Sequence, residues 1–376
     1  MKKLLLIGGG HSHVEVMRRF ALRPAADVRI TVVNPTTHTP YSGMLPGLIA
    51  GHYTFRQCHI DLPALARSTG CRFVTAAING LHPDARLAFC DTGETLEYDV
   101  TSIDIGSTPA TLGVAGATRH GLKVKPTDRF LQEWDALLER ARDNTLPDGF
   151  RIVMAGGGAA GVEVLLSIQH RLQCVGFSGA RYAVVTDGND ILAGHSASTR
   201  ALFRRVLRQR GVGLHLGKRI AEATRNGLVT SAGEQIPADL IIWATGAAPA
   251  GWPGACGLTV NERGFIRVAD TLQVVGQANV FATGDIASMD AFPRPKSGVY
   301  AVRQGPPLAE NLHRALNGKS LLTYHPQRRA LALISTGDRY AVASRGWLFA
   351  SGAWVWRWKD RIDRGFMKRY GVDDRP

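Results

Sequence analysis

Apolar residues in this chain gather in short runs that stop at glycine. Leu4-Leu5-Leu6-Ile7 runs into Gly8-Gly9-Gly10, and Ile152-Val153-Met154-Ala155 runs into Gly156-Gly157-Gly158. After each glycine turn, apolar residues return at helical spacing, which predicts helices over residues 13–22 and 162–172. The pattern therefore predicts the same unit twice: a buried strand, a tight turn and a helix.

This unit suits the pyrophosphate of a dinucleotide. Glycine lets the backbone approach the anion closely, and the amides at the start of the helix face it. The second turn keeps the three glycines of G-x-G-x-x-G, which are Gly156, Gly158 and Gly161. The first turn has His13 in the third place, so the usual basis for close helix packing is missing there. Two such turns favour an enzyme that binds a flavin and a nicotinamide cofactor over flexible glycine loops.

Three later segments also end in glycine. Two apolar runs predict strands that end at Gly246 and at Gly284-Asp285, and a weaker one leads to Gly106. We expect these turns to surround a cofactor. The pattern predicts a doubly wound α/β protein.

Composition narrows the class of protein only slightly. The 376 residues carry a net charge of +14, which suggests an anionic partner: nucleic acid, acidic lipid or the dinucleotides themselves. No recognised nucleic-acid module is present, so we expect no specific nucleic-acid partner. The five cysteines are scattered, which argues against a disulfide framework or a zinc site. The first apolar run stops at Gly8 without a cleavage site, and a cytoplasmic protein is expected.

Two basic segments differ in character. The arginines between Arg200 and Arg210 alternate with apolar residues as in an ordinary amphipathic surface helix. From Trp347 to Tyr370, tryptophans are interleaved with basic residues over a stretch too short in apolar residues to span a bilayer. That composition favours a helix lying on an anionic membrane surface. The alternative is a C-terminal helix docked on its own protein or on a dimer partner, with its tryptophans buried.

The ordered set of motifs resembles a known group of flavoproteins. The two glycine turns, Ile105-Gly106-Ser107-Thr108-Pro109, Ala244-Thr245-Gly246 and Ala282-Thr283-Gly284-Asp285 are similar to the pyridine nucleotide-disulfide oxidoreductase superfamily. The segment from Thr37 to Gly47 resembles type II NADH dehydrogenases and sulfide:quinone oxidoreductases. The segments His11-Ser12-His13 and Val299–Gly305 resemble the flavoprotein branch often fused to selenide, water dikinase.

The resemblance implies roles in binding FAD. Gly8, Gly9 and Gly10 would hold the FAD pyrophosphate, and Asp285 would accept a hydrogen bond from the ribityl chain. Asn34 stands where an acidic residue usually holds the adenosine ribose. Lys296 precedes the helix whose start would point at the flavin and stabilise its reduced, anionic form.

It also implies a nicotinamide site at the second turn. Gly156, Gly158 and Gly161 would hold that pyrophosphate, and Asp187 would favour NADH over NADPH because it repels a 2′-phosphate. Glu163 would reach the nicotinamide and flavin as a positioning or proton-handling residue. The alternative is an exposed glutamate that the helix dipole favours.

We therefore expect two Rossmann-like domains: an FAD domain over residues 1–115 and 255–320, an NAD domain over 116–254, and a C-terminal extension over 321–376. Electrons would pass from NADH through FAD to a second acceptor, for which a quinone is the first candidate. The glutamines of the quinone site in type II NADH dehydrogenases are replaced here by Val299 and Arg303. A sulfide- or selenium-compound oxidoreductase and a redox-sensing flavoprotein are the alternatives. The expected location is the cytoplasm, either free or on the inner face of the membrane.

Overall fold

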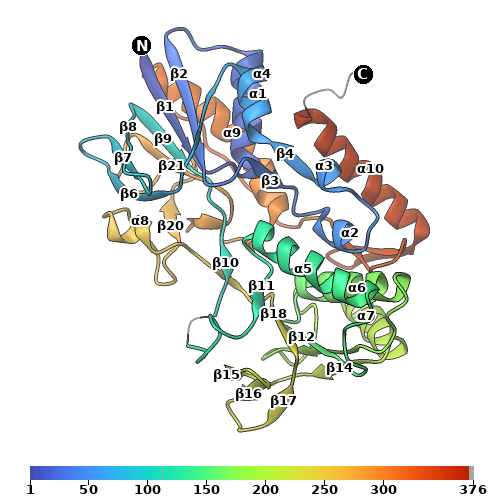
Figure 1. The fold of residues 1–376 in the computed structure, drawn as a ribbon. Helices are drawn as coiled ribbons and strands as arrows, with labels where there is room; N and C mark the ends of the chain where they lie inside the picture. Colours follow the sequence, from blue (N-terminus) through green and yellow to red (C-terminus); the bar gives the residue numbers. More distant parts are fainter. Residues whose placement is uncertain (112, 372–376) are drawn as a thin grey trace.

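The computed structural model describes residues 1–111 and 113–371. Two parallel five-stranded sheets organise the chain, and helices cover both (Figure 1). The first sheet has the order β21-β9-β1-β2-β5, and the second has the order β11-β18-β12-β13-β14. The predicted doubly wound α/β class is confirmed.

The strands of the first sheet are β1 (Lys2–Ile7), β2 (Val28–Asn34), β5 (Arg72–Thr75), β9 (Val100–Ile103) and β21 (Val280–Ala282). Those of the second are β11 (Leu122–Lys123), β12 (Arg151–Ala155), β13 (Arg181–Val185), β14 (Val212–His215) and β18 (Leu240–Trp243). Smaller sheets pair β3 (His38–Pro40) with β4 (His59–Asp61), β10 (Thr108–Pro109) with β19 (Ala247–Ala248), and β20 (Ile266–Val268) with β22 (Ala287–Met289). Three-stranded sheets join β6 (Ile78–His82), β7 (Leu87–Cys90) and β8 (Thr95–Glu97), and β15 (Ile220–Thr224), β16 (Gly227–Thr230) and β17 (Gln235–Pro237).

The helices are α1 (His11–Leu22), α2 (Leu45–Ile49), α3 (Phe55–Cys58), α4 (Leu62–Thr69), α5 (Thr127–Arg142), α6 (Ala159–Cys174), α7 (Ala197–Gln209), α8 (Trp252–Ala255), α9 (Gly298–Leu316) and α10 (Ala353–Tyr370), with a 3-10 turn η1 over Gly284–Ile286. Both motif helices, α1 and α6, begin directly after their glycines, two or three residues earlier than the apolar spacing predicts. The reason is that the added residues, His11 and Ser12 in α1 and residues 159–161 in α6, are polar or small and add no large apolar side chain to the pattern. The basic segment before Arg210 forms the amphipathic helix α7, with Leu202, Phe203 and Leu207 buried.

The strand register aligns the carboxyl ends of the neighbouring strands β2, β1, β9 and β21 in the first sheet. Ile7 pairs with both Val33 and Ile103, and Ile103 pairs with Ala282. The residues that follow β1, β9 and β21 therefore meet at one edge. In the second sheet, Ala155 pairs with Val185 and Trp243, which brings three further strand ends together.

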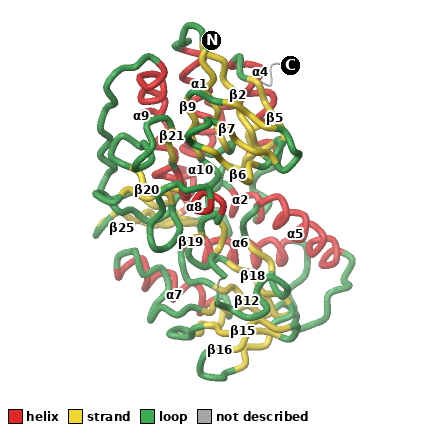
Figure 2. The backbone as a smooth tube through the Cα atoms, turned by 90° about the vertical axis from the view of Figure 1, so that its left-hand side faces the viewer, coloured by secondary structure: helices red, strands yellow, loops and turns green. Residues whose placement is uncertain are grey.

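The C-terminal segment packs on elements from both halves of the chain: α10 contacts α3 and β4, and its first strand, β23, contacts α6. Strands β23 (Ala332–Ser335), β24 (Ala341–Arg345) and β25 (Leu348–Gly352) make an antiparallel sheet, and α10 follows it (Figure 2). One face of α10 is buried against the protein through Val355, Phe366, Met367 and Tyr370. The last five residues of the expected extension, 372–376, lie outside the described part of the chain.

Candidate functional site

The first glycine turn is a tight link between β1 and α1. Gly8 has a φ of +93°, and a Cβ there would overlap the backbone carbonyl of Asp104, so this position requires glycine. Gly8 donates its amide to the Val33 carbonyl at 2.8 Å. The amides of Gly10 and His11 donate to no acceptor among the described residues, so both are available to an anion at the start of α1.

His13 takes the place of the third glycine and packs closely. Its ring is fully buried, with Nδ1 2.6 Å from the Gly8 carbonyl oxygen and Nε2 2.8 Å from Ser102 Oγ. Burial lowers the pKa of His13 to about 4, so the ring is neutral: Nδ1 donates to the carbonyl and Nε2 accepts from the hydroxyl. Close packing at this point, which the missing glycine made doubtful, comes from a side chain that bridges the glycine turn and β9.

Asp104 was missed by sequence reasoning. It directly follows β9, it is buried, and one carboxylate oxygen accepts a hydrogen bond from the Ser12 amide at 2.9 Å. A Cβ on Gly10 or on Gly284 would overlap this carboxyl group. Burial first, and the nearby Asp285 as a smaller cause, raise the pKa of Asp104 to about 7, although the backbone amides of Ser12 and His13 oppose the shift. In the sequence, only the position of Asp104 directly after a short predicted strand indicates that it belongs to the site.

Asp285 gathers polar groups from three segments. Its Oδ2 accepts hydrogen bonds from Lys125 Nζ at 3.0 Å and from Ser107 Oγ at 3.2 Å. His11 lies nearby: burial first, and Lys125 second, lower its pKa to about 4, and its buried Nε2 has no partner among the described residues. Gly106, before Ser107, has open space where a Cβ would stand.

Asn34 is placed at the turn, but its side chain binds the protein. Its Oδ1 accepts from the Gly9 amide at 2.8 Å, and its Nδ2 donates to the Thr36 carbonyl at 2.7 Å. The carboxamide therefore fixes the shape of the first glycine turn. Its expected contact with an adenosine ribose stays a prediction.

Lys296 lies two residues before α9, where the sequence placed it. Its Nζ donates to the Ala287 carbonyl and lies 4.1 Å from the centre of the Phe265 ring. Burial lowers the pKa of Lys296 to about 8. Gln304 of α9 accepts a hydrogen bond from the Gly284 amide at 2.7 Å, which ties this helix to the turn that carries Asp285.

The second glycine turn repeats the first with a more open entrance. Gly156 has a φ of +127°, and a Cβ there would overlap the Ala244 carbonyl. A Cβ on Gly158 or on Gly246 would meet open space, and the amides of Gly158 and Ala159 donate to no acceptor among the described residues. Gly161 packs directly on the Gly156 carbonyl, as the third glycine of the pattern should. Asp187 is exposed beyond the end of β13.

Glu163 faces the C-terminal segment. Its Oε1 accepts a hydrogen bond from the Ser335 amide at 2.6 Å, so it is not the exposed helix-start residue of the alternative interpretation. Burial raises its pKa, and the ammonium of Lys359 opposes that shift. Lys359 is itself buried in α10, with Nζ 2.6 Å from Asp363 and 2.5 Å from the Gly43 carbonyl oxygen.

The aromatic C-terminal segment combines parts of both interpretations made from the sequence. The helix is docked on its own protein, yet Trp354 and Trp358 are 52% and 40% exposed, and Trp347 is 80% exposed. Ile362, Arg357 and Arg361 are exposed on the same helix. Among the described residues, no helix is both long and apolar enough to cross a bilayer.

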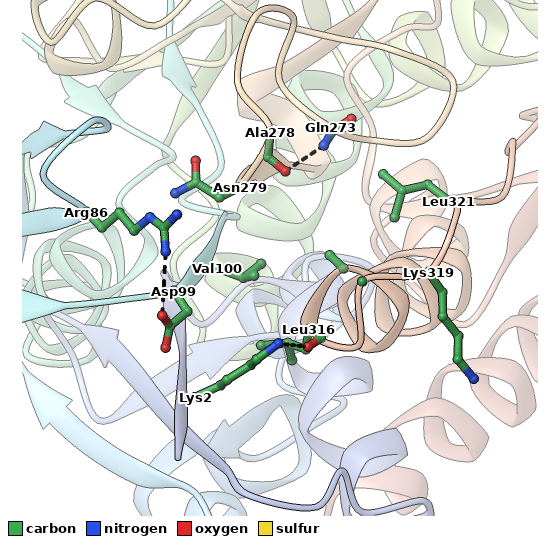
Figure 3. Close-up of a pocket in the computed structure, with 12 residues that line it drawn as sticks. Lys2, Arg86, Asp99, Val100, Gln273, Ala278, Asn279, Leu316, Lys319 and Leu321 are labelled. Atoms are coloured by element: carbon green, nitrogen blue, oxygen red, sulfur yellow. Dashed lines mark hydrogen bonds and ion pairs between the residues drawn. The ribbon is translucent and has the colours of Figure 1, made fainter.

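Two other features lie away from the glycine turns. All five cysteines are free thiols, and Cys174 ends α6, about 22 Å along the helix from Ala159. A cavity of about 330 Å³ opens at the opposite edge of the first sheet, beside Lys2, Val100 and Asn279 (Figure 3). It contains none of the residues that the sequence singled out.

Both turns fit the dinucleotides that the motifs imply. Each offers unpaired backbone amides at the start of a long helix, and the second has space where a side chain would stand. The residues fit a flavin at the first turn because Asp285 and Lys296 lie beside it.

Known proteins with similar sequences agree with this geometry. A family model described as pyridine nucleotide-disulphide oxidoreductase matches residues 2–305. An NADH dehydrogenase-like protein of Mycobacterium tuberculosis is 24% identical over 235 residues, which cover 61% of this chain and 59% of that relative. A type II NADH:quinone oxidoreductase of Staphylococcus aureus is 22% identical over 339 residues, 85% of this chain and 84% of its own.

Solved structures give the same fold. The sulfide:quinone oxidoreductase of Aquifex aeolicus superposes with a TM-score of 0.83 at 16% identity, over 98% of this chain and 91% of that one. Because a family model covers most of the chain and the two glycine turns have the geometry it requires, the chain belongs to the pyridine nucleotide-disulphide oxidoreductase family.

Proposed function

We propose that this protein is an FAD-dependent oxidoreductase that passes electrons from NADH to a quinone. The observation that carries the proposal is the pair of glycine turns, each with unpaired amides at a helix start. Members of this family typically bind FAD and NAD(P)H. FAD, when bound, supplies the hydride acceptance and electron release that no side chain of the protein can perform.

The first turn would hold FAD. Gly8, Gly9 and Gly10 would supply the backbone that faces the pyrophosphate, and Gly106 leaves room beside it. Asp285 would accept the ribityl hydrogen bond, in exchange for Ser107 or Lys125. Lys296 and the start of α9 would stabilise negative charge on the reduced flavin, because they present positive charge without any rearrangement.

The second turn would hold the nicotinamide cofactor. Gly156, Gly158, Gly161 and Gly246 line the approach, and exposed Asp187 would accept the ribose hydroxyls of NADH. Glu163 would position the nicotinamide or handle a proton. Its raised pKa supports the proton-handling role, because burial favours the protonated form of the carboxyl group, which can donate a proton.

A quinone is favoured over a sulfur or selenium compound. Cys174 stands at the far end of α6 from the second glycine turn, so this exposed thiol does not lie beside the expected nicotinamide position. The relative from Staphylococcus aureus is named a type II NADH:quinone oxidoreductase and the structural neighbour from Aquifex aeolicus a sulfide:quinone oxidoreductase, so both names include a quinone.

The exposed aromatic residues support a membrane surface as the place where the quinone is met. Trp347 is exposed in the turn before β25, and Trp354, Trp358 and Ile362 are exposed on α10 together with Arg357 and Arg361. Indoles prefer the interface of a bilayer, and each basic residue near an anionic surface adds about 1 kcal/mol. Replacing Trp354 and Trp358 by serine should release the protein from phosphatidylglycerol vesicles, measured by co-sedimentation. The exposed Phe89 on β7, replaced by serine, is the control.

The central experiment follows flavin absorbance without oxygen. NADH should bleach the flavin of the purified protein faster than NADPH does, and a quinone should restore the colour. Sulfide and selenide serve as rival electron sources in the same cuvette. Bleaching by sulfide but not by NADH would replace the proposed function with the sulfur alternative.

A further inference from the structure

Asp190 pairs with two arginines of α7. Its Oδ2 lies 3.3 Å from Arg200 Nη1 and 3.6 Å from Arg204 Nη1, and its side chain is 13% exposed. The other oxygen, Oδ1, accepts a hydrogen bond from the Ile191 amide at 2.9 Å. The carboxylate is thus fixed from one side and draws both guanidinium groups to the other.

This cluster adjoins the second glycine turn. The loop after β13 folds back onto the turn, because the Leu192 amide donates to the Gly157 carbonyl at 2.7 Å. A Cβ on Gly157 would lie 3.1 Å from the side chain of Thr186. In a dinucleotide held by such a turn, the adenosine ribose extends over the end of the second strand, which here is β13. The loop that carries Asp187 and Asp190 therefore borders the ribose.

Lys218, which is hydrogen-bonded to this loop through its backbone amide, also pairs with a carboxylate. The Lys218 amide donates to the Thr186 carbonyl at 2.8 Å, and Lys218 Nζ lies 2.5 Å from Glu234 Oε2. Arg200, Arg204 and Lys218 therefore each face a carboxylate. Asp187 forms no ion pair among the described residues and stays available.

Arginine side chains recognise a 2′-phosphate through charge-assisted hydrogen bonds, so a free pair here would bind NADPH. We propose that Asp190 determines specificity for the nicotinamide cofactor, because it pairs with Arg200 and Arg204, leaves neither guanidinium group free for a 2′-phosphate and thereby favours NADH. The inference rests on the proposed function and adds a second carboxylate to the repulsion expected from Asp187. Without Asp190, two unopposed guanidinium groups would stand where one carboxylate now offsets them.

The test measures binding of adenosine 2′,5′-bisphosphate and adenosine 5′-monophosphate by calorimetry. These probes differ only in the 2′-phosphate and require no turnover. Asp190→Asn keeps the shape of the side chain, and it should tighten the bisphosphate at least tenfold while the monophosphate stays within twofold. Adding Arg200→Gln and Arg204→Gln should remove that gain, whereas adding Arg205→Gln, an exposed arginine of the same helix, should leave it.

Other outcomes overturn the inference. Unchanged bisphosphate binding in Asp190→Asn would show that the arginines do not reach the ribose. Loss of bisphosphate binding when Arg200 and Arg204 alone are replaced would show that they already serve a 2′-phosphate in the natural protein. If the natural protein binds the monophosphate but the variants do not differ, only this inference fails. If it binds neither probe nor NADH, the proposed function fails as well.

Discussion

The two glycine turns share one geometry, strand, turn and helix, but different groups stabilise them. The second turn uses backbone almost alone: Gly161 packs on Gly156, and Gly158 faces open space. The first turn is filled by side chains, since His13 bridges Gly8 and Ser102 while Asp104 binds the start of α1. The geometry of the motif therefore tolerates replacement of a glycine, provided that other polar groups satisfy the turn. The first turn gains groups that titrate, and the second does not.

Replacing the first glycine of either turn by alanine should have the largest effect. Gly8→Ala and Gly156→Ala each combine a positive φ with overlap against a backbone carbonyl, so unfolding free energy should fall by more than about 4 kcal/mol. Chemical denaturation measures it. Gly176→Ala is the matched control, because its φ is +90° but its Cβ would meet nothing; it should cost about 1 kcal/mol. If the Gly156 and Gly176 variants lose the same unfolding free energy, the overlap of the Cβ with the Ala244 carbonyl has no effect on stability.

His13→Gly restores the family pattern and should nevertheless destabilise the protein by about 3 kcal/mol. It leaves a cavity and removes the partners of the Gly8 carbonyl and the Ser102 hydroxyl. Thermal unfolding of the variant gives the answer. A neutral or stabilising effect would mean that the ring only fills space.

Asp104→Asn tests the titrating group of the first turn. A carboxyl group whose pKa is raised in the folded state is most favourable below its unfolded pKa, and its contribution is lost as the pH rises through the folded value. For Asp104 this window runs from about 4 to about 7. The variant should therefore gain stability relative to the natural protein across that range, by on the order of a few kcal/mol at pH 8. Melting temperatures of both proteins from pH 4 to pH 8 measure this gain. A difference in melting temperature that stays constant with pH would contradict the prediction.

Asp285→Ala should weaken FAD binding by about 2 kcal/mol, because a hydrogen bond to a charged group is lost. The retained flavin after gel filtration, measured by absorbance, reports the change. Asp290→Ala is a useful control, since Asp290 pairs with Arg267 on the surface. Equal flavin retention in both variants would end the assignment of Asp285.

The sequence predicted those parts of the molecule that follow from local pattern. Apolar runs that stop at Gly8 and Gly156 indicate strand, turn and helix because strands buried on both faces must be apolar throughout. It could not predict Asp104 or Lys125 as partners of the site. Each lies far along the chain from the turn it contacts, and only the pairing of β1 with β9 and the return of the chain near Asp285 bring them there. Nor could it show that one face of α10 is buried while Trp354 remains exposed.

The strand order of the two sheets also has a consequence during synthesis of the chain. The second sheet is made from residues 122–243, a continuous stretch that the ribosome completes before the first sheet can close. The first sheet needs β21, whose first residue, Val280, emerges long after Ile103, the last of β9. At 5–20 residues per second this interval is roughly 10 to 35 s. Tyr370, near the end of the chain, then donates its hydroxyl to Glu15 at 2.8 Å. A ribosome that stops early would leave the nicotinamide half folded beside an unfinished flavin half, which is the state that chaperones and proteases would meet.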